Sequence, residues 1–599
     1  MTSHYPIGAT AGLSPSPAGL RILLLGTCAV SPIVDAAATS GQTADHLLYE
    51  SYSFSPKQSA NIENYDVCVV SLTLRHIFQE ASGAFTNNFN GDDLLLLKLN
   101  SDESLEKYLE LCKHFLKIQF DKIALNGSAV PTFFLSFLEP RENLTGLLAP
   151  IFKLTNPAYF IRKMNEYLCN LLTEKPGFHM LDVNALANAF GRRRIQDDYT
   201  LHIAHASYIS DFDVSYDTNR LQKSIAPSAM YQSAEAIKEF GQHLIERLAE
   251  SIKVIRQSHP IKLIIVDLDD TLWRGVAADD DRPDWEFTEG WPLGLVEALL
   301  IFKRRGGLLA ICSKNDHDGT AARFEKIWKG RISLSDFASV KINFDRKSAN
   351  IEEILNEVNI LAESTLFIDD NPREIEEVRE AFSQLRTLSA QHYDWRRVIL
   401  TSAETQSFLN TTESQNRTEL IKAKIQRDSA RKGLSTGDWL ASLEIKQRHK
   451  LISDQNDSDF ERAFELLNKT NQFNTTGRRW TRDEIVTRMA GGAYFVASFL
   501  RDRLVDNGLV GLSLVDGNEI LQAVLSCRVF NMEAEYSSGH VVCNLILENH
   551  DTVVGRFAET GKNFTCREYF KNMGFEKNGD IFVTAKLPPH PTHIESTIG

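Results

Sequence analysis

One stretch of the sequence, Ile261 to Gly275 (IKLIIVDLDDTLWRG), constrains the fold more than any other. Its apolar run leads into acidic residues, which predicts a buried strand whose carboxyl end carries carboxylates into a crevice. Asp267 and Asp269 are two residues apart, so their side chains lie on the same side of an extended chain. Neighbouring carboxylates repel each other, so this site calls for a divalent cation or a shared proton. An acidic N-capped turn after a strand is the alternative, and the rest of the chain decides between them.

Three later segments support a catalytic site. A second apolar strand ends at Ser313, and Lys347 stands at the approach to a predicted helix. A third strand ends in Asp369 and Asp370, after which Asn371 and a proline can start a helix. A parallel sheet gathers the carboxyl ends of its strands at one edge. Together these groups are what metal-assisted phosphoryl transfer needs: a nucleophile, a proton shuttle, an anion clamp and Mg²⁺ ligands.

The order DxDxT, Ser, Lys and DD resembles the haloacid dehalogenase (HAD) superfamily, and DLDDTLW, LLAICSKND and FIDDNPRE resemble its FkbH-like branch. The resemblance implies that Asp267 takes the phosphoryl group, while Asp269 protonates the leaving oxygen and then activates water. It also implies that phosphoryl oxygens are bound by Thr271, Ser313 and Lys347. Mg²⁺ would be bound by Asp267, Asp369 and the backbone carbonyl of Asp269, with Asp370 replacing or assisting Asp369. Arg274 stands where the family often has glycine, which leaves the shape of the following flap open.

The composition limits the class of protein. A chain of 599 residues is too long for one core, so three or four domains are expected. The net charge of −14 argues against nucleic acid or an anionic membrane as the main partner. Eight cysteines without a CxxC pair fit a reducing cytoplasm, and the apolar run from Leu20 to Val30 is too short to span a bilayer. We therefore expect a cytoplasmic protein.

Upstream of the acidic motif, strands alternate with helical segments, which predicts another parallel α/β sheet. The predicted strands begin at Arg21, Asp66, Pro131 and Gly177. This region resembles the SGNH-hydrolase-like domain of longer FkbH-like proteins. It departs from an active SGNH enzyme, because Gly26-Thr27-Cys28 lacks the Gly-Asp-Ser turn and neither His202 nor His205 follows an Asp by three residues. We expect a degenerate hydrolase fold used for binding or assembly, with Cys28 packed in a tight turn.

The predicted fold class is multidomain α/β. Apolar residues at helical spacing from Ser233 to Ser258 predict an amphipathic helix leading into the second sheet. Between Asp267 and Ser313 the chain holds an acidic flap at 279–281 and a helix, which leaves no room for a sizeable cap domain. The predicted parts are a flexible tail (1–18), an SGNH-like parallel sheet (19–230), a capless HAD Rossmann-like parallel sheet (231–400), a helical connector (401–450) and a GNAT-like α+β domain (451–599).

The C-terminal region carries two informative segments. Asn468–Thr476 also looks FkbH-like, and Asn563–Phe575 resembles the last helix and turn of GNAT acyltransferases. Strands are predicted at Tyr494–Leu500, Leu509–Val515 and Ile520–Val529. In a GNAT enzyme, a glycine-rich loop after the central strand presents N–H groups to the CoA pyrophosphate. The matching stretch here, Cys527–Ala534, has no glycine, which favours a cradle for a phosphopantetheine arm over one for acetyl-CoA.

The resemblance to FkbH-like proteins implies a function with two chemistries. A glyceryl or related three-carbon unit would be loaded from 1,3-bisphosphoglycerate onto an acyl carrier protein (ACP), as in polyketide biosynthesis. That function combines Mg²⁺-dependent phosphate removal with acyl transfer through a thiol. One alternative is a plain HAD phosphatase acting on a small phosphorylated metabolite, and another is a scaffold without activity. The intact motif set speaks against the scaffold.

Cys312 is the predicted acyl carrier. It ends the strand that places Ser313, so its thiol would lie near the substrate, where Lys314, Lys347 and Mg²⁺ would lower the thiol pKa. Alternation along the strand can also turn Cys312 into the core, opposite Ser313. The other candidate carriers are Cys527, Cys543 and Cys28.

The expected partners are an ACP, reached through its phosphopantetheine arm, and a phosphorylated three-carbon substrate, with no nucleic acid and no membrane. An ACP is usually acidic and so is this chain, so docking needs a local basic patch. We predict that the patch draws on Arg478, Arg479, Arg482 and Lys469, with Lys303 and Arg304 as the second choice.

Overall fold

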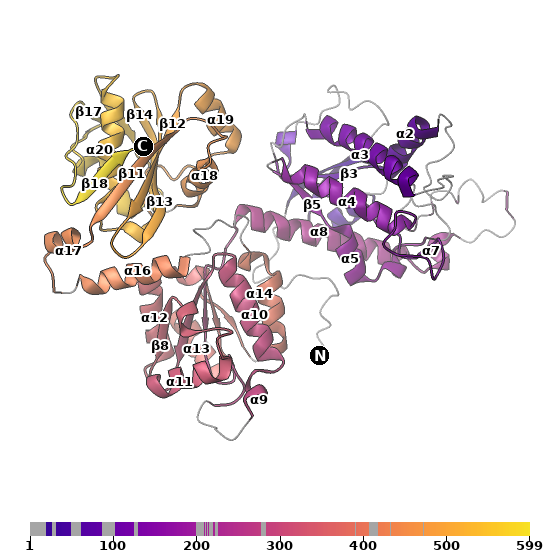
Figure 1. Cartoon of the computed structure of the whole chain (residues 1–599), viewed down its shortest axis with the longest axis horizontal. Coiled ribbons are helices and arrows are strands. Elements are labelled where there is room, and N and C mark those ends of the chain that lie inside the picture. The colour runs from indigo at the N-terminus through magenta and orange to yellow at the C-terminus, as the bar shows by residue number, and fades with distance from the viewer. Residues whose placement is uncertain are drawn as a thin grey trace. The chain divides into compact units, whose positions relative to one another are not determined.

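The computed structural model describes residues 19–26, 31–48, 62–86, 102–124, 130–175, 177–198, 209, 211, 214, 220–221, 226–276, 283–389, 391–406, 417–431, 433–470 and 472–599. The chain divides into two compact units, one of Met1–Ser258 with Thr401–Glu404 and one of His259–Leu400 with Thr405–Gly599. Two parallel sheets and one mixed sheet confirm the predicted multidomain α/β class (Figure 1). Cys28, His202, His205 and the tail at 1–18 lie outside the described residues, so the predictions about them stay open.

The first unit contains a five-stranded parallel sheet in the order β2-β1-β3-β4-β5. The strands are β1 (Arg21–Gly26), β2 (Thr43–Leu48), β3 (Val67–Ser71), β4 (Thr132–Leu135) and β5 (Phe178–Leu181). The helices are α1 (Ser31–Thr39), α2 (Leu74–Thr86), α3 (Asp102–Ala124), α4 (Pro157–Thr173), α5 (Val183–Phe190), α7 (Pro227–Met230) and α8 (Ala234–Arg256). Leu23 and Leu25 pack against α2, α3 and α4, whereas Ile22 and Leu24 face α1, α5 and α8. Helices therefore cover both faces of the sheet.

Two features of this unit differ from the predictions. The amphipathic helix α8 precedes β6 in the chain, as predicted, but it packs on the first sheet, because Phe240, Leu244 and Leu248 belong to the core of that sheet. The first unit therefore extends to Ser258, beyond the predicted boundary at 230. Strand β2 was not predicted because its sequence, TADHLL, has neither a continuous apolar run nor strict alternation.

The second unit begins with a parallel sheet in the order β10-β9-β6-β7-β8. Its strands are β6 (Leu263–Val266), β7 (Leu308–Ser313), β8 (Ser339–Ile342), β9 (Thr365–Ile368) and β10 (Arg386–Leu388). Its helices are α9 (Asp284–Thr288), α10 (Trp291–Arg304), α11 (His317–Trp328), α12 (Lys347–Val358), α13 (Pro372–Ala381) and α14 (His392–Thr401). Between β6 and β7 the described elements are only α9 and α10, which agrees with the absence of a sizeable cap from this part of the chain. The acidic flap at 279–281 lies outside the described residues.

The rest of the second unit carries an eight-stranded mixed sheet in the order β16-β17-β15-β14-β13-β12-β11-β18. Its strands are β11 (Ile445–Ile452), β12 (Tyr494–Arg501), β13 (Asp506–Asp516), β14 (Glu519–Leu525), β15 (Val553–Arg556), β16 (Glu576–Asn578), β17 (Ile581–Thr584) and β18 (Ile594–Ile598). Its helices are α16 (Arg417–Ala430), α17 (Thr436–Ser442), α18 (Phe460–Lys469), α19 (Arg482–Ala490), α20 (Ala534–Leu547) and α21 (Tyr569–Asn572). Helix α20 packs against β11, β12 and β13 (Figure 1).

The predicted connector at 401–450 is only partly a connector. Helices α16 and α17 lie within it, as expected, but β11 begins at Ile445 and pairs with both β12 and β18. Buried and exposed residues alternate along most of β11, but the buried ones include the polar Gln447 and His449, so the sequence shows no alternation of apolar and polar residues. In the described parts of the chain, no helix is both long enough and apolar enough to cross a lipid bilayer.

Candidate active site and metal centre

Asp267 follows β6 directly, and a buried strand sets its position. All four residues of β6 are buried between its neighbours β7 and β9. The backbone N–H of Asp267 donates to the carbonyl of Ile368 at 3.0 Å, which ties the end of β6 to the end of β9. Asp267 and Asp369 are thereby brought to the same edge of the sheet, as the parallel arrangement predicts.

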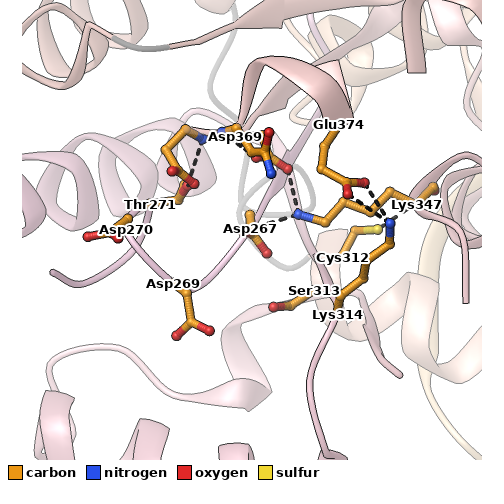
Figure 2. Close-up of polar contacts among 12 residues, drawn as sticks. Asp267, Asp269, Asp270, Thr271, Cys312, Ser313, Lys314, Lys347, Asp369 and Glu374 are labelled. Carbon is orange, nitrogen blue, oxygen red and sulfur yellow. Dashed lines mark hydrogen bonds and ion pairs between the residues drawn. The ribbon is translucent and has the colours of Figure 1, made fainter. Parts of the chain in front are cut away.

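Lys347 is the first residue of α12, and its ammonium lies between two of the predicted acidic residues (Figure 2). Its Nζ is 2.6 Å from Asp369 Oδ2 and 3.1 Å from Asp267 Oδ2, and all three side chains are buried. Burial alone would lower the pKa of Lys347, but the charges of Asp267 and Asp369 outweigh burial and raise that pKa. The lysine is therefore a fixed positive charge in the site.

Asp267, Asp369 and Asp370 form the candidate metal centre. One carboxylate oxygen from each lies within 4.8 Å of the others. Asp267 Oδ1 is buried and has no hydrogen-bond partner, although such oxygens are normally satisfied. Carboxylate oxygens are the ligands that Mg²⁺ prefers, so this donor set fits Mg²⁺. The side chain of Asp269 lies outside this group, which leaves its backbone carbonyl as its predicted contribution.

The same three carboxyl groups hold their protons more tightly than usual. Burial raises the pKa of Asp267 to about 6, against the opposing charge of Lys347 and with the help of Asp369. Burial also raises the pKa values of Asp369 and Asp370. Ionised carboxylates are needed to bind a cation, so the affinity for Mg²⁺ should fall as the pH falls through about 6.

Removing the Asp267 charge should stabilise the metal-free protein more at neutral pH than at acid pH. The folded pKa of about 6 lies above the usual 3.8, so the stability that this group contributes is full below about pH 4 and lost as the pH rises through about 6. The quantity to compare is the free energy of unfolding of Asp267→Asn minus that of the wild type. This difference should become more positive by roughly 3 kcal/mol from about pH 4 to about pH 7. Urea unfolding in EDTA at both pH values measures the gain, and an equal difference at both would contradict the raised pKa.

The Asp269 carboxylate is held by two side chains that were not among the predicted site residues. Trp273 Nε1 donates to Asp269 Oδ1 at 2.9 Å. Asn315 Nδ2 donates to Asp269 Oδ2 at 3.0 Å and to Ser313 Oγ at 3.1 Å. Asn315 thus connects the predicted acid–base residue to a predicted phosphate-binding residue. A signal for it was present, because Asn315 follows Ser313 by two residues and so falls on the same side of an extended chain.

Replacing Asn315 by alanine should lower the rate of phosphate release by about ten- to a hundredfold. The change removes two hydrogen bonds, and one to a charged group contributes about 1.5–3 kcal/mol. Steady-state assays should show the loss mainly in kcat, because Asn315 positions Asp269 for proton transfer. Asn456→Ala, an exposed asparagine bonded to Asp454, is the control and should keep full activity. Equal rates for both variants would remove Asn315 from the site.

The remaining predicted residues also meet at this edge. Thr271 Oγ1 accepts from the backbone N–H of Asp370 at 3.1 Å, and Ser313 is buried at the end of β7. Asp270 has a φ of 48°, in the left-handed region, and accepts from the backbone N–H of Gly275 at 2.6 Å through Oδ1. This turn reverses the chain directly after Asp267 and Asp269 and brings Thr271 back to the carboxyl edge of the sheet. The structure therefore brings Asp267, Thr271, Ser313, Lys347, Asp369 and Asp370 together, while their roles stay predictions.

Arg274, which stands where the HAD proteins that the sequence resembles often have glycine, helps to shape the turn after β6. Its guanidinium lies over the ring of Trp291 at 5.7 Å, and its backbone N–H donates to the carbonyl of Phe287 at 3.0 Å. His392 packs against Trp291 with the two rings tilted and their centroids 4.4 Å apart, and it contacts the carbonyl of Asp270 at 2.9 Å. The arginine therefore connects the acidic turn to α9 and α10.

Cys312 packs in the core, which was the alternative left open for it. Its side chain is fully buried with Leu263, Ile265 and Ile351. Burial raises the pKa of the thiol and outweighs the charge of Lys347, which lowers that pKa as predicted, so the expected thiolate is not favoured. The Nζ of Lys314, which was expected to act on the thiol, pairs instead with Glu374 at 2.8 Å (Figure 2).

Two other candidate thiols, Cys527 and Cys543, lie before and within α20. Cys527 is half-buried at the beginning of the short helix η9 (Cys527–Val529), whereas Cys543 is buried within α20. The glycine-free segment between η9 and α20 contains Asn531 with a φ of 66° and Glu533 with a φ of 60°. Two residues other than glycine thus adopt the left-handed conformation that a glycine-rich loop would adopt at lower cost.

No protein-family model matches the sequence, and no curated protein matches it. Among solved structures, the N-terminal part of protein BF1531 from Bacteroides fragilis, which contains a phosphatase domain complexed with Mg, is 20% identical. That match covers 64% of this chain and 95% of the other, with a TM-score of 0.41.

Two further solved structures are more distant. The Pnkp1/Rnl/Hen1 RNA repair complex is 13% identical over 63% of this chain and 98% of the other, with a TM-score of 0.17. MnaA of S. aureus with UDP is 10% identical over 69% of this chain and 97% of the other, with a TM-score of 0.14. With TM-scores this low, none of the three similarities carries weight for the chemistry of the site.

Proposed function

We propose that the second unit is a Mg²⁺-dependent phosphatase of the HAD type with Asp267 as its nucleophile. The observation that carries the proposal is the Lys347 ammonium held between Asp267 and Asp369, beside a carboxylate oxygen without a partner. A structural ion pair would satisfy both carboxylates, whereas a phosphoryl-transfer site needs one oxygen left for the substrate or the cation. The order of the four sequence motifs supports the same proposal.

In the proposed reaction, an Asp267 oxygen attacks the phosphorus and the bond to the leaving oxygen breaks. Asp269 gives a proton to the leaving group, and then takes a proton from the water that hydrolyses the aspartyl-phosphate. Thr271 and Ser313 hold phosphoryl oxygens, and Lys347 neutralises the developing negative charge. When bound by the Asp267, Asp369 and Asp370 carboxylates and the Asp269 carbonyl, Mg²⁺ would supply further positive charge.

The finer proposal is transfer of a three-carbon acyl unit to an ACP, and it rests on the resemblance to FkbH-like proteins. A protein thiolate would attack the acyl carbon of an acyl phosphate such as 1,3-bisphosphoglycerate, breaking the bond to the phosphate oxygen and releasing inorganic phosphate. The Asp267 site would hydrolyse the remaining phosphate ester, and the thioester would pass to the pantetheine thiol of the ACP, which frees the protein thiol. Among the candidate thiols in the described residues, Cys312 and Cys543 are buried. The half-buried Cys527 is therefore the better carrier.

The predicted basic patch supports ACP docking less than expected. Arg478 pairs with Glu484 at 2.7 Å, and Lys469 pairs with Glu465 at 2.7 Å. Arg482 pairs with Glu461, and Arg479 donates to the carbonyl of Thr470 at 2.9 Å. The charges that were to attract an acidic partner are thus largely neutralised within the domain. Docking through this patch would require exchange of these ion pairs for contacts with the ACP.

The experiment is incubation with Mg²⁺, 1,3-bisphosphoglycerate and a holo-ACP, followed by phosphate measurement and intact-mass analysis of both proteins. Phosphate release with a glyceryl adduct on the ACP is the expected result. Peptide mapping should place the intermediate adduct on Cys527, and Cys312→Ser should leave it undiminished. An adduct lost in a folded Cys312→Ser protein would return the carrier role to Cys312.

Phosphate release without any acyl adduct on either protein would support the plain phosphatase instead. That alternative is favoured by one observation, the burial of Cys312 beside the phosphate site. Absence of Mg²⁺-dependent phosphate release from this substrate and from a panel of small phosphorylated metabolites would refute the phosphatase proposal itself.

A further inference from the structure

A turn of the first unit exposes an unusual run of large apolar side chains. Between β4 and α4, the exposed fractions are 96% for Leu147, 100% for Leu148, 57% for Ile151 and 67% for Phe152. Single exposed apolar residues are ordinary, but a contiguous group marks an interaction surface. We call Leu147, Leu148 and Ile151 the apolar turn.

The apolar turn has a defined backbone conformation. Asn143 accepts from Thr145 Oγ1 at 2.6 Å and donates to the carbonyl of Ala149 at 3.1 Å. The backbone N–H groups of Gly146 and Ala149 close two further turns, onto the carbonyls of Asn143 and Gly146, at 3.1 Å each. A turn held in this way loses little conformational entropy on binding, which favours association.

A cavity lies beside the apolar turn. It has a volume of about 440 Å³ and is formed by the packed helices α3 and α4 (Figure 1) with the segment 152–154 that follows the turn. Its apolar and aromatic lining consists of Leu109, Phe152, Leu154, Tyr159 and Tyr167. The projecting group and the cavity therefore occupy one continuous face, since Phe152 comes directly after Ile151 and lines the cavity.

The charges around the cavity limit what can enter it. Three acidic residues, Asp102, Glu106 and Glu166, balance three lysines at positions 113, 153 and 163. Lys153 pairs with Asp102 at 3.2 Å, and Lys163 pairs with Glu166 at 2.7 Å. A charge-balanced rim gives no attraction to a strongly charged ligand or a polyanion. The rim also does not repel a second copy of this chain, although the whole chain carries a net charge of −14.

We propose that this face binds a second copy of the chain, with the apolar turn of each copy inserted into the cavity of the other. A projection and a recess on the same face satisfy the requirement of a two-fold interface, in which each contact occurs twice. The apolar turn fits the apolar lining, and the balanced rim charges can pair between copies as they pair within one. This inference is independent of the phosphatase proposal.

Sedimentation velocity of the full chain across a wide range of concentration tests the proposal. The wild type should show a concentration-dependent dimer. In the Leu147→Asp/Leu148→Asp variant, the dissociation constant of the dimer should be at least about tenfold higher for each leucine replaced. The variant should therefore remain monomeric at concentrations where the wild type dimerises. Leu361→Asp, a change at a 60% exposed leucine of the second unit, is the control and should dimerise normally. A monomeric wild type, or a dimer unaffected by the double variant, would overturn the proposal.

Disulfide cross-linking tests whether the turn meets the cavity. A chain with Leu148→Cys is mixed with a chain with Asn170→Cys, both carrying Cys169→Ser because Cys169 is exposed. Mild oxidation should link the two different chains in the mixture. A dimer without this link would place the interface elsewhere and refute the reciprocal insertion. Circular dichroism should show unchanged folding, because Leu148 is fully exposed.

Discussion

Asp267→Asn should lower Mg²⁺-dependent phosphate release by at least about a thousandfold while the fold is retained. The amide has nearly the same volume as the carboxylate but cannot attack phosphorus, so the covalent route is lost. It also removes one of the three carboxylates of the candidate metal centre. Phosphate release under saturating Mg²⁺ measures the effect. Calorimetric titration should show weaker Mg²⁺ binding as well.

Asp345→Asn is the matched control for that variant. Asp345 is exposed on the loop that precedes Lys347, and its carboxylate is not part of the candidate metal centre. Its amide variant should keep wild-type activity and Mg²⁺ affinity. Full phosphatase activity in a folded Asp267→Asn protein would eliminate Asp267 as the nucleophile and, with it, the proposed reaction.

Lys347→Met should have the largest effect on stability and should also abolish the proposed phosphatase activity. Without the ammonium, the Asp267 and Asp369 carboxylates remain buried together with no positive charge between them. Breaking a buried ion pair by removal of one partner costs about 3–5 kcal/mol. Urea unfolding in EDTA should show this loss, and saturating Mg²⁺ should restore part of it, because the cation takes over the role of compensating charge.

Lys341→Met is the matched control for the lysine. Lys341 lies on the neighbouring strand β8 and pairs with two residues of α12, Glu353 at 2.8 Å and Glu357 at 2.7 Å, and the Glu353 side chain is largely exposed. Solvent screens this pair, so its loss should cost no more than about 1 kcal/mol and leave activity intact. If Lys347→Met were no less stable than Lys341→Met in EDTA, the buried charge arrangement would not have the energetic role inferred for it.

Local patterns in the sequence predicted much of the candidate site. The apolar run of β6 and the acidic residues after it identified Asp267, because side chains alternate strictly along a strand. Asn371 caps α13 and Pro372 occupies its first turn, as their order predicted. These features depend on neighbouring residues and on covalent geometry, so they can be recognised before the chain is folded.

The partners of each side chain depended instead on the tertiary structure. Alternation allowed Cys312 to face either the substrate or the core, and packing against Leu263 and Ile351 decided for the core. The helical pattern of α8 predicted an apolar face but not that the first sheet would cover it. A periodic pattern defines which face is buried, but not which element buries it.

The sequence by itself determined the acidic strand ends, the lysine before a helix and the alternation of strands and helices. It thereby predicted a multidomain α/β protein and a site for phosphoryl transfer. Only the tertiary structure decided that Lys347 lies between Asp267 and Asp369, that Asn315 joins Asp269 to Ser313, and that carboxylates neutralise most of the predicted basic patch. The physical reason is the separation along the chain of the residues that interact. Strand and helix patterns arise from residues a few positions apart, whereas charge pairing and burial depend on distances between segments that only the packed fold brings together.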